Sequence, residues 1–326
     1  MNIRLISRLA ALGLAAAALA APAAPRLIVL NKSDNTMVVV DPATLKVLGK
    51  VPTGEGPHEA AITADGKFAV VANYGAMKPE NSLSVIDIDA LKERERVDLG
   101  ALTRPHGIQT VKDKIYFTSE TTRSVARFDP STSKIDWLMG TGASASHMLV
   151  VSPDGRKLYT SNIASNNVTT IRLDGPANAQ GIAQISVGAQ PEAIDISPDG
   201  REVWVGHNGD GGVSIIDTAM NAVIATLKAG SLPIRLKFSP DGKWVFVSDP
   251  RGGEGEVIVI DAAKREVVSR IKVPGVPLGL QFSADGKTVY VSRTQAGRVD
   301  AIDVVKREVM GSVETGNGPD GLAWRN

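Results

Sequence analysis

Residues 56–74 read Gly-Pro-His-Glu-Ala-Ala-Ile-Thr-Ala-Asp-Gly-Lys-Phe-Ala-Val-Val-Ala-Asn-Tyr, and degraded copies of this stretch recur to the end of the chain. Six later pairs match its Pro57-His58: Pro105-His106, Ser146-His147, Pro191-Glu192, Pro233-Ile234, Pro277-Leu278 and Pro319-Asp320. Successive pairs are 48, 41, 45, 42, 44 and 42 residues apart. A period in the low-to-middle forties is typical of propeller blades and solenoid units.

Each repeat carries the pattern of four short strands. In the first repeat, residues 60–63 form a strand that leads into Asp65-Gly66, and the apolar run 68–71 follows. An Asp-Gly pair between two hydrophobic runs predicts a hairpin, because Asp bonds the turn backbone and Gly adopts the positive φ. A third strand ends at Asp87, whose side chain we expect to bond the next turn, and a charged fourth strand opens at Lys92.

The two ends of the chain predict how the ring closes. Residues 319–324 supply only a first strand, whereas 27–30, 37–40 and 47–51 supply second, third and fourth strands with no first strand before them. We therefore expect an all-β, seven-bladed β-propeller of four-stranded blades whose last blade is shared by both termini. Residues 21–326 are predicted to form this single domain.

Residues 1–20 have the pattern of a secretory signal peptide. Arg4 and Arg8 precede a short Ala/Leu run, and small residues lie near a cleavage site at about residue 20. The run is short for a bilayer span. The sequence predicts a periplasmic or secreted protein, without a membrane span once the peptide is cleaved, and a monomer.

Charge and cysteine content exclude several classes of function. The formal charge is +1, and removing Arg4 and Arg8 makes it 1 − 2 = −1. A net charge this close to zero gives no electrostatic attraction that would favour nucleic acid as a partner. The chain has no cysteine, which excludes disulfides, thiolate metal ligands and a cysteine nucleophile. We found no phosphate-binding loop, dinucleotide fingerprint or serine-hydrolase elbow.

Several segments resemble the bacterial YVTN-repeat seven-bladed β-propellers. These are Ser-Pro-Asp-Gly-Arg-Lys-Leu-Tyr-Thr-Ser-Asn (152–162), Ser-Val-Ile-Asp (84–87) and Val-Tyr-Val-Ser (289–292). The resemblance covers essentially the whole mature chain and implies the propeller fold. The wider superfamily includes lactone hydrolases of the 6-phosphogluconolactonase-like type, haem d1 and copper propellers, and proteins with no known reaction, so the resemblance implies no single activity.

Two rings of positions are predicted to converge on one mouth of the central channel, because one hairpin joins the far ends of strands one and two. The inner ring starts strand one and consists of His58, His106, His147, Glu192, Ile234, Leu278 and Asp320. The second ring ends strand two and consists of Asn31, Asn73, Glu120, Asn162, His207, Asp249 and Arg293. All four histidines of the chain fall in these rings.

The histidines suggest a metal or ligand site at the mouth. His58, His106 and His147 start three consecutive blades, and Glu192 starts the next. Three imidazoles and a carboxylate suit one divalent ion such as zinc, copper or iron. Hydrogen bonding to backbone or water, and inheritance by duplication, would also explain the pattern. Four second-ring residues are predicted to bind a small ligand: Asn73, Asn162, His207 and Asp249.

Three functions remain open from the sequence. The first is a binding propeller that holds a metal or small polar ligand. The second is a lactonase-like hydrolase in which His106 or His147 acts as general base, Glu120 or Glu192 orients it, and Arg293 stabilises the oxyanion. The third is a protein-interaction scaffold, which the polar outer strands support poorly.

Overall fold

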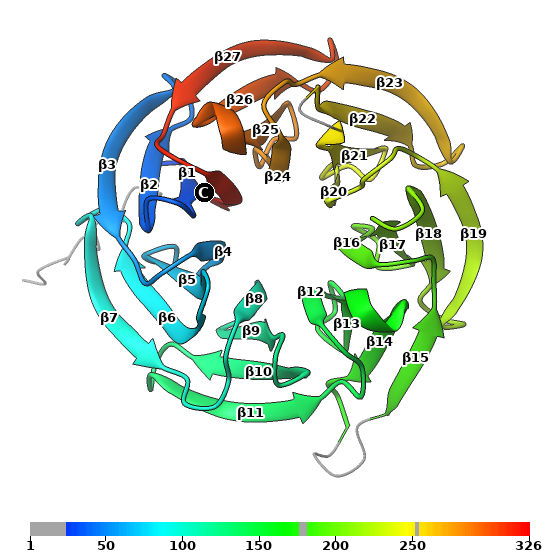
Figure 1. Ribbon diagram of the computed structural model, residues 1–326, viewed down its shortest axis with the longest axis horizontal. Helices are drawn as coiled ribbons and strands as arrows, with labels where there is room; N and C mark the ends of the chain where they lie inside the picture. Colours follow the sequence, from blue (N-terminus) through cyan, green and yellow to red (C-terminus); the bar gives the residue numbers. More distant parts are fainter. Residues whose placement is uncertain (1–23, 176–180, 252–253) are drawn as a thin grey trace, which may run out of the picture.

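In the computed structural model of the protein, which describes residues 24–175, 181–251 and 254–326, the strands form seven four-stranded antiparallel sheets around a central axis (Figure 1). The seven-bladed β-propeller is thus confirmed. The predicted signal peptide, residues 1–20, lies outside the described residues. No helix in the described ranges is long and apolar enough to cross a membrane.

Six blades follow one another along the chain, each with its four strands ordered from the axis outward. The first three are β4 (Pro57–Ile62), β5 (Phe68–Gly75), β6 (Pro79–Asp87) and β7 (Lys92–Asp98); β8 (Pro105–Val111), β9 (Lys114–Ser119), β10 (Ser124–Asp129) and β11 (Lys134–Gly140); and β12 (Ser146–Val151), β13 (Lys157–Asn162), β14 (Asn167–Arg172) and β15 (Ile182–Ser186). The next three are β16 (Pro191–Ile196), β17 (Glu202–His207), β18 (Gly212–Asp217) and β19 (Ala222–Lys228); β20 (Arg235–Phe238), β21 (Trp244–Asp249), β22 (Glu256–Asp261) and β23 (Glu266–Lys272); and β24 (Pro277–Phe282), β25 (Thr288–Arg293), β26 (Arg298–Asp303) and β27 (Glu308–Glu314). Two short 3-10 turns, η1 (Ile163–Ser165) and η3 (Thr294–Ala296), follow β13 and β25.

The seventh blade joins the two ends of the chain. Its inner strand is β28 (Pro319–Arg325), and β1 (Arg26–Asn31), β2 (Thr36–Asp41) and β3 (Lys46–Pro52) complete it, as the sequence predicts. The Arg325 guanidinium lies buried and donates to Asp89 Oδ2 at 2.8 Å and to the Ala24 carbonyl at 2.9 Å. Strand pairing and this ion pair together close the ring.

The hydrophobic core lies between neighbouring blades. The second and third strands of the blades, such as β17 and β18, are buried on both faces, which explains their near-continuous apolar runs. Trp204, for example, is fully buried and packs edge-on against Phe238 of the next blade. Burial of a large apolar side chain contributes roughly 1.5–3 kcal/mol, so many such contacts hold the ring together.

The Asp-Gly turns behave as predicted. Asp65 accepts hydrogen bonds from the Thr63 hydroxyl and the Lys67 amide, and Gly66 has a φ of 71°. The second repeat lacks this glycine, and there Lys112 takes the left-handed conformation with a φ of 56°. Asp87 bonds the amides of the following turn, also as predicted.

Candidate functional site

A β-bulge at the start of the inner strands aims the ring residues at the channel mouth. In β4, Pro57 pairs with Asn73 and Glu59 pairs with Ala72, so His58 is the extra residue. Equivalent shifts occur near the starts of β8, β12, β16, β24 and β28. A bulge can re-aim a side chain, and here it does so at a shared register.

Two glycines let neighbouring inner strands approach closely around the axis. A Cβ on Gly321 would lie 2.0 Å from the carbonyl oxygen of His58. A Cβ on Gly107 would lie 2.9 Å from the carbonyl oxygen of His147. Because only glycine fits these contacts, the backbones that carry the histidines are held against the adjacent blades.

The imidazoles of three inner-ring residues lie against one another in a tilted row, the histidine stack, with interplanar angles of 46° and 36°. The ring centroids of His58 and His106 are 4.0 Å apart, and those of His106 and His147 are 3.7 Å apart. His106 is fully buried, whereas His58 and His147 each retain 8% of their accessible surface. The predicted convergence of these three side chains is present in the structure.

Two carboxylates flank His147. Its Nδ1 lies 3.2 Å from Glu120 Oε2, and its Nε2 lies 3.6 Å from Glu192 Oε1. The Tyr74 hydroxyl donates to the same Glu120 oxygen at 2.8 Å, and the Asn208 amide donates to Glu192. Glu120 and Glu192 therefore lie where the sequence predicts, at the mouth beside a histidine.

His58 and His106 have ring nitrogens without hydrogen-bond partners among the described residues. Both nitrogens of His106 and Nδ1 of His58 are buried in this state. Asp320 Oδ2 lies 3.5 Å from His58 Nδ1, and Lys32 approaches Asp320 at 3.9 Å. Buried polar atoms normally have partners, so these unpaired nitrogens require an explanation.

A buried ion pair beneath the histidines escaped the sequence analysis. Arg235 donates to Glu59 Oε1 from Nη2 at 2.7 Å and from Nε at 3.1 Å, and its Nη1 lies 3.4 Å from Glu192. The sequence alignment of repeats placed Ile234 in the inner ring. In the fifth blade, Arg235 pairs with Ser248 as Glu59 pairs with Ala72 in the first blade, so both charged residues stand one place after the inner ring. The available signal was charge at a register where three other blades have glycine, namely Gly107, Gly279 and Gly321.

Burial and neighbouring charges give the histidines at the mouth different pKa values. Burial and the nearby cations hold the pKa values of His58 and His106 well below the ordinary value, so both rings are neutral near pH 7. Burial also acts to lower the pKa of His147, but its interactions with Glu120 and Glu192 outweigh burial and raise the pKa. Burial raises the pKa of Asp320 to about 6.

These shifts predict how the histidines titrate. Nitrogen NMR of the imidazoles should show His147 protonated at pH 6 while His58 and His106 remain neutral, because Glu120 and Glu192 raise the pKa of His147 whereas burial and nearby cations lower the other two pKa values. The two neutral rings also favour unfolding in acid. Below about pH 6.5 the unfolded chain binds protons that the folded rings do not, so their contribution to stability falls as the pH is lowered. A His106→Leu variant should lose less stability than the wild type between pH 7.5 and 5.5, and an equal loss would contradict the assignment.

Most second-ring side chains hold the loops between blades. His207 donates from Nδ1 to Asp210, and its Nε2 accepts from the Gly188 amide. Asp249 accepts from the Ser231 amide at 2.5 Å, and Arg293 donates to the Pro274 carbonyl and pairs with Asp300.

Asn73 and Asn162 bond hydroxyls on the neighbouring strand of their own blades. The contacts of Asn73, Asn162, His207, Asp249 and Arg293 are thus with their own blades and loops, and the structure does not bring these five residues to the histidine stack. Glu120, which the sequence pattern assigns to the second ring, does reach it, from one residue beyond the end of β9.

The family follows from a comparison of the sequence with known families. Residues 5–174, about half of the chain, match the family described as YNCE-like beta-propeller. The chain belongs to this YNCE-like family. The resemblance drawn from the repeat motifs is thereby confirmed. No curated protein sequence matches the chain significantly.

Solved structures share the YNCE-like fold at low sequence identity. A protein of unknown function from Desulfotomaculum acetoxidans aligns with a TM-score of 0.77 and 15% identity over 92% of this chain and 99% of its own. A protein from Bacteroides uniformis, provisionally named a 6-phosphogluconolactonase, aligns with a TM-score of 0.75 and 13% identity over 93% of this chain and 100% of its own. A Lactobacillus plantarum protein aligns with a TM-score of 0.75 and 13% identity over 92% of this chain and 99% of its own. At this identity the likeness shows the fold alone.

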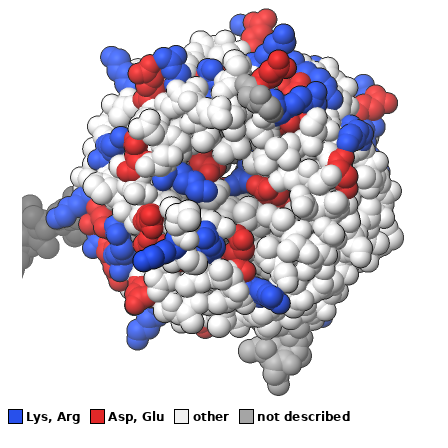
Figure 2. Space-filling model, viewed as in Figure 1, with Lys and Arg blue, Asp and Glu red and all other residues white. Residues whose placement is uncertain are grey.

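The channel continues below the ion pair of this YNCE-like propeller. A cavity of about 300 Å³ is lined by inner-strand residues of all seven blades, with Glu59 and Arg235 in its wall. Charged side chains of both signs gather around the opening at the centre of the face seen in Figure 2. Charged groups of both signs therefore surround the opening, and a small cavity lies further along the channel.

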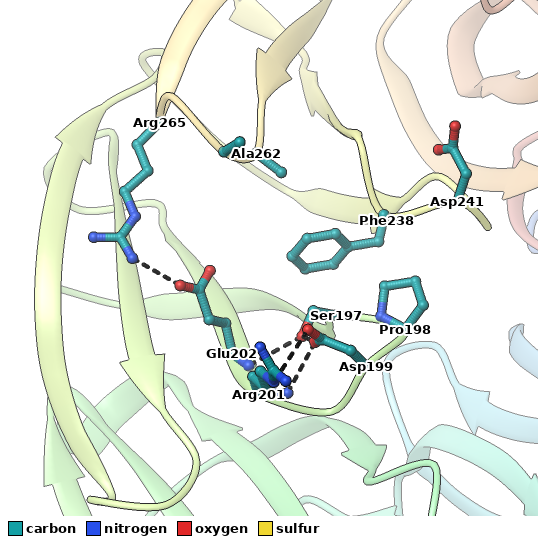
Figure 3. A pocket seen from close by; sticks show the side chains of 11 residues that line it. Ser197, Pro198, Asp199, Arg201, Glu202, Phe238, Asp241, Ala262 and Arg265 are labelled. Carbon is teal, nitrogen blue, oxygen red and sulfur yellow. Dashed lines mark hydrogen bonds and ion pairs between the residues drawn. The ribbon is translucent and has the colours of Figure 1, made fainter.

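A second cavity, of about 410 Å³, lies between the fourth and fifth blades (Figure 3). It is lined by Ser197 and Asp199 of the turn after β16 and by Phe238 of β20, and Arg265 pairs with Glu202 at its side. The turn lies at the opposite end of β16 from Glu192. This cavity is therefore separate from the histidine stack.

The described residues contain no three His, Asp or Glu side chains already spaced to hold one metal ion. The stacked rings explain this, since their centroids lie 3.7–4.0 Å apart. The predicted metal ligands His58, His106, His147 and Glu192 nevertheless lie together at the mouth. Metal binding remains a prediction.

Proposed function

We propose that this propeller binds a small polar ligand at the mouth of its central channel, through the imidazoles of His58, His106 and His147. One observation carries the proposal: both ring nitrogens of the fully buried His106 are without hydrogen-bond partners among the described residues. A buried polar group left unpaired costs about 1–3 kcal/mol, and a ligand that bonds these nitrogens offsets that cost. The surrounding carboxylates and Arg235 orient the ligand.

The proposal is tested by measuring ligand-induced stabilisation. Untagged protein is heated with a panel of sugar acids, small carboxylates, phosphate, lactones and divalent cations. At least one compound should raise the unfolding temperature, because a ligand that binds only the folded state stabilises it by mass action. His106→Leu and His147→Gln should abolish the shift. The control is His207→Asn, because asparagine occupies the same register in the first and third blades. A panel without effect on the wild type would overturn the proposal.

Hydrolysis of a lactone is a second candidate, favoured by the position of His147 between two carboxylates. Glu120 and Glu192 raise the basicity of this imidazole. The ring can take a proton from water as the water oxygen attacks the carbonyl carbon, and can then return it to the departing alkoxide. Arg235 and Lys32 are the nearby cations for the oxyanion, since Arg293 is committed to Asp300. Turnover of a lactone panel that survives His147→Gln unchanged would dismiss this candidate.

The proposed function includes export to the periplasm or beyond. The basic and apolar residues of 1–20 support it. Expression of the full-length gene followed by fractionation and N-terminal sequencing tests it. We expect a chain that starts near residue 21 in the periplasmic or secreted fraction, and an uncleaved cytoplasmic chain would contradict it.

A further inference from the structure

We infer that the mouth ligand is a single divalent transition-metal ion, bound by imidazole nitrogens of His58, His106 and His147. The inference rests on the proposed function, since it names the ligand of the same site. The three rings come from consecutive blades, and His106 lies against both of the others, whose centroids are 6.4 Å apart. Imidazole is a donor for zinc, copper, iron and nickel, whereas calcium and magnesium prefer oxygen ligands.

The carboxylates stand where a metal site needs them. Glu120 bonds Nδ1 of His147, and Asp320 faces Nδ1 of His58 at 3.5 Å. Metal-ligating histidines almost always place a carboxylate or carbonyl on the ring nitrogen that does not bind the metal. The Nε2 atom of His58 is thus left for an ion, whereas Nε2 of His147 faces Glu192 Oε1 at 3.6 Å and must turn from it to bind one. His106 lies between these rings, and neither of its nitrogens has a partner among the described residues.

The charge balance of the mouth favours a cation. The four carboxylates are Glu59, Glu120, Glu192 and Asp320, and the cations near them are Lys32, Arg104 and Arg235. Four carboxylates thus stand against three side-chain cations beside the imidazoles. A divalent ion would be offset by these carboxylates without any of them entering its coordination sphere.

Binding requires the rings to separate. With nitrogen–zinc distances of about 2.0–2.1 Å and tetrahedral angles, imidazole centroids lie about 5 Å apart. The neighbouring pairs lie at 4.0 and 3.7 Å and must open by about 1 Å, whereas the centroids of His58 and His147 lie 6.4 Å apart and must close by about 1 Å. His58 and His147 retain some exposure at the mouth and can rotate away from His106 and toward each other.

Zinc titration calorimetry on untagged, chelator-treated protein tests the inference. We expect one equivalent of zinc chloride to bind, with no heat from calcium chloride. His106→Leu should weaken zinc binding by more than about 100-fold, and Glu120→Gln by about 10–100-fold at unchanged stoichiometry, since it removes only the partner of His147. His207→Asn should bind zinc like the wild type. Circular dichroism confirms that each variant is folded.

The possible outcomes distinguish a failure of the metal inference from a failure of the proposed binding function. If zinc, copper, nickel and ferrous salts all fail to bind the wild type while an organic member of the panel still stabilises it, the metal inference is wrong and the proposed function stands. If the folded Glu120→Gln and His147→Gln variants bind zinc as tightly as the wild type, the ion lies elsewhere and the inference is also wrong. If neither metals nor organic compounds bind, both proposals fail.

Discussion

Replacing Arg235 with leucine is expected to lower the free energy of unfolding by about 3–5 kcal/mol, the cost of breaking a buried ion pair from one side. Arg235 is only 7% exposed and pairs with Glu59 and Glu192. Without the guanidinium, both carboxylates lose their main counter-charge in a site that already holds Asp320. The destabilisation is therefore electrostatic rather than a loss of packing.

Urea unfolding measures this loss. The Arg235→Leu and Glu59→Leu double variant should be less destabilised than the sum of the two single variants, because it removes the charge that the arginine leaves unpaired. Arg201→Leu is the matched control, since its side chain is 84% exposed and pairs with Asp199 at the surface. An exposed ion pair contributes at most about 1 kcal/mol. If Arg235→Leu costs no more than Arg201→Leu, the mouth does not depend on this ion pair.

Ending the chain at residue 318 is expected to prevent cooperative folding. The truncation removes β28, the inner strand of the seventh blade, and leaves the buried edge of β1 without its partner. It also removes Leu322, Ala323 and the Arg325–Asp89 contact. Both neighbouring blades lose apolar partners, so the ring cannot close.

Thermal unfolding followed by circular dichroism reports on the truncation. A circular permutant in which residues 319–326 run directly into residue 25 is the control. The end of β28 lies opposite the start of β1, with Arg325 paired to Arg26, so a short connection suffices. The permutant should unfold cooperatively and the truncated chain should not. A truncated chain with wild-type stability would show that the shared blade is dispensable.

The sequence was sufficient for the fold because the repeat constrains it at several levels. The period, the Asp-Gly turns and the apolar second strands each recur in most units. The split of the seventh blade also followed, since strands at 27–51 have no first strand before them while residues from Pro319 have no second strand after them. These local signals agree with one another, as expected of a sequence that specifies one structure.

The site was predictable only in part, because register gives the position of a residue and not the direction of its side chain. His58, His106 and His147 share a bulged start of the inner strand, and their convergence was predicted correctly. Glu59 and Arg235 were missed. Both stand one place after the inner ring, opposite Ala72 and Ser248, and which side chains at a strand start reach the axis is a feature of strand pairing that one sequence does not reveal.

The second ring also shows that sequence register alone does not predict which side chains reach the site. The sequence pattern aligns Glu120 with His207, but β9 ends at Ser119, which pairs with Pro105 as His207 pairs with Pro191. Glu120 therefore lies one residue beyond the ring, beside Tyr74 of the preceding blade and His147, whereas His207 lies within the ring and bonds Asp210. Such partners are set by packing between blades.

A crystal structure of the untagged protein, grown with the most stabilising compound or metal salt of the panel, tests the central claim most directly. The account predicts density for non-protein atoms within bonding distance of a ring nitrogen of His106, and imidazoles drawn apart from their stacked positions. Density for the compound at another place on the propeller, with His58, His106 and His147 still stacked, would contradict it.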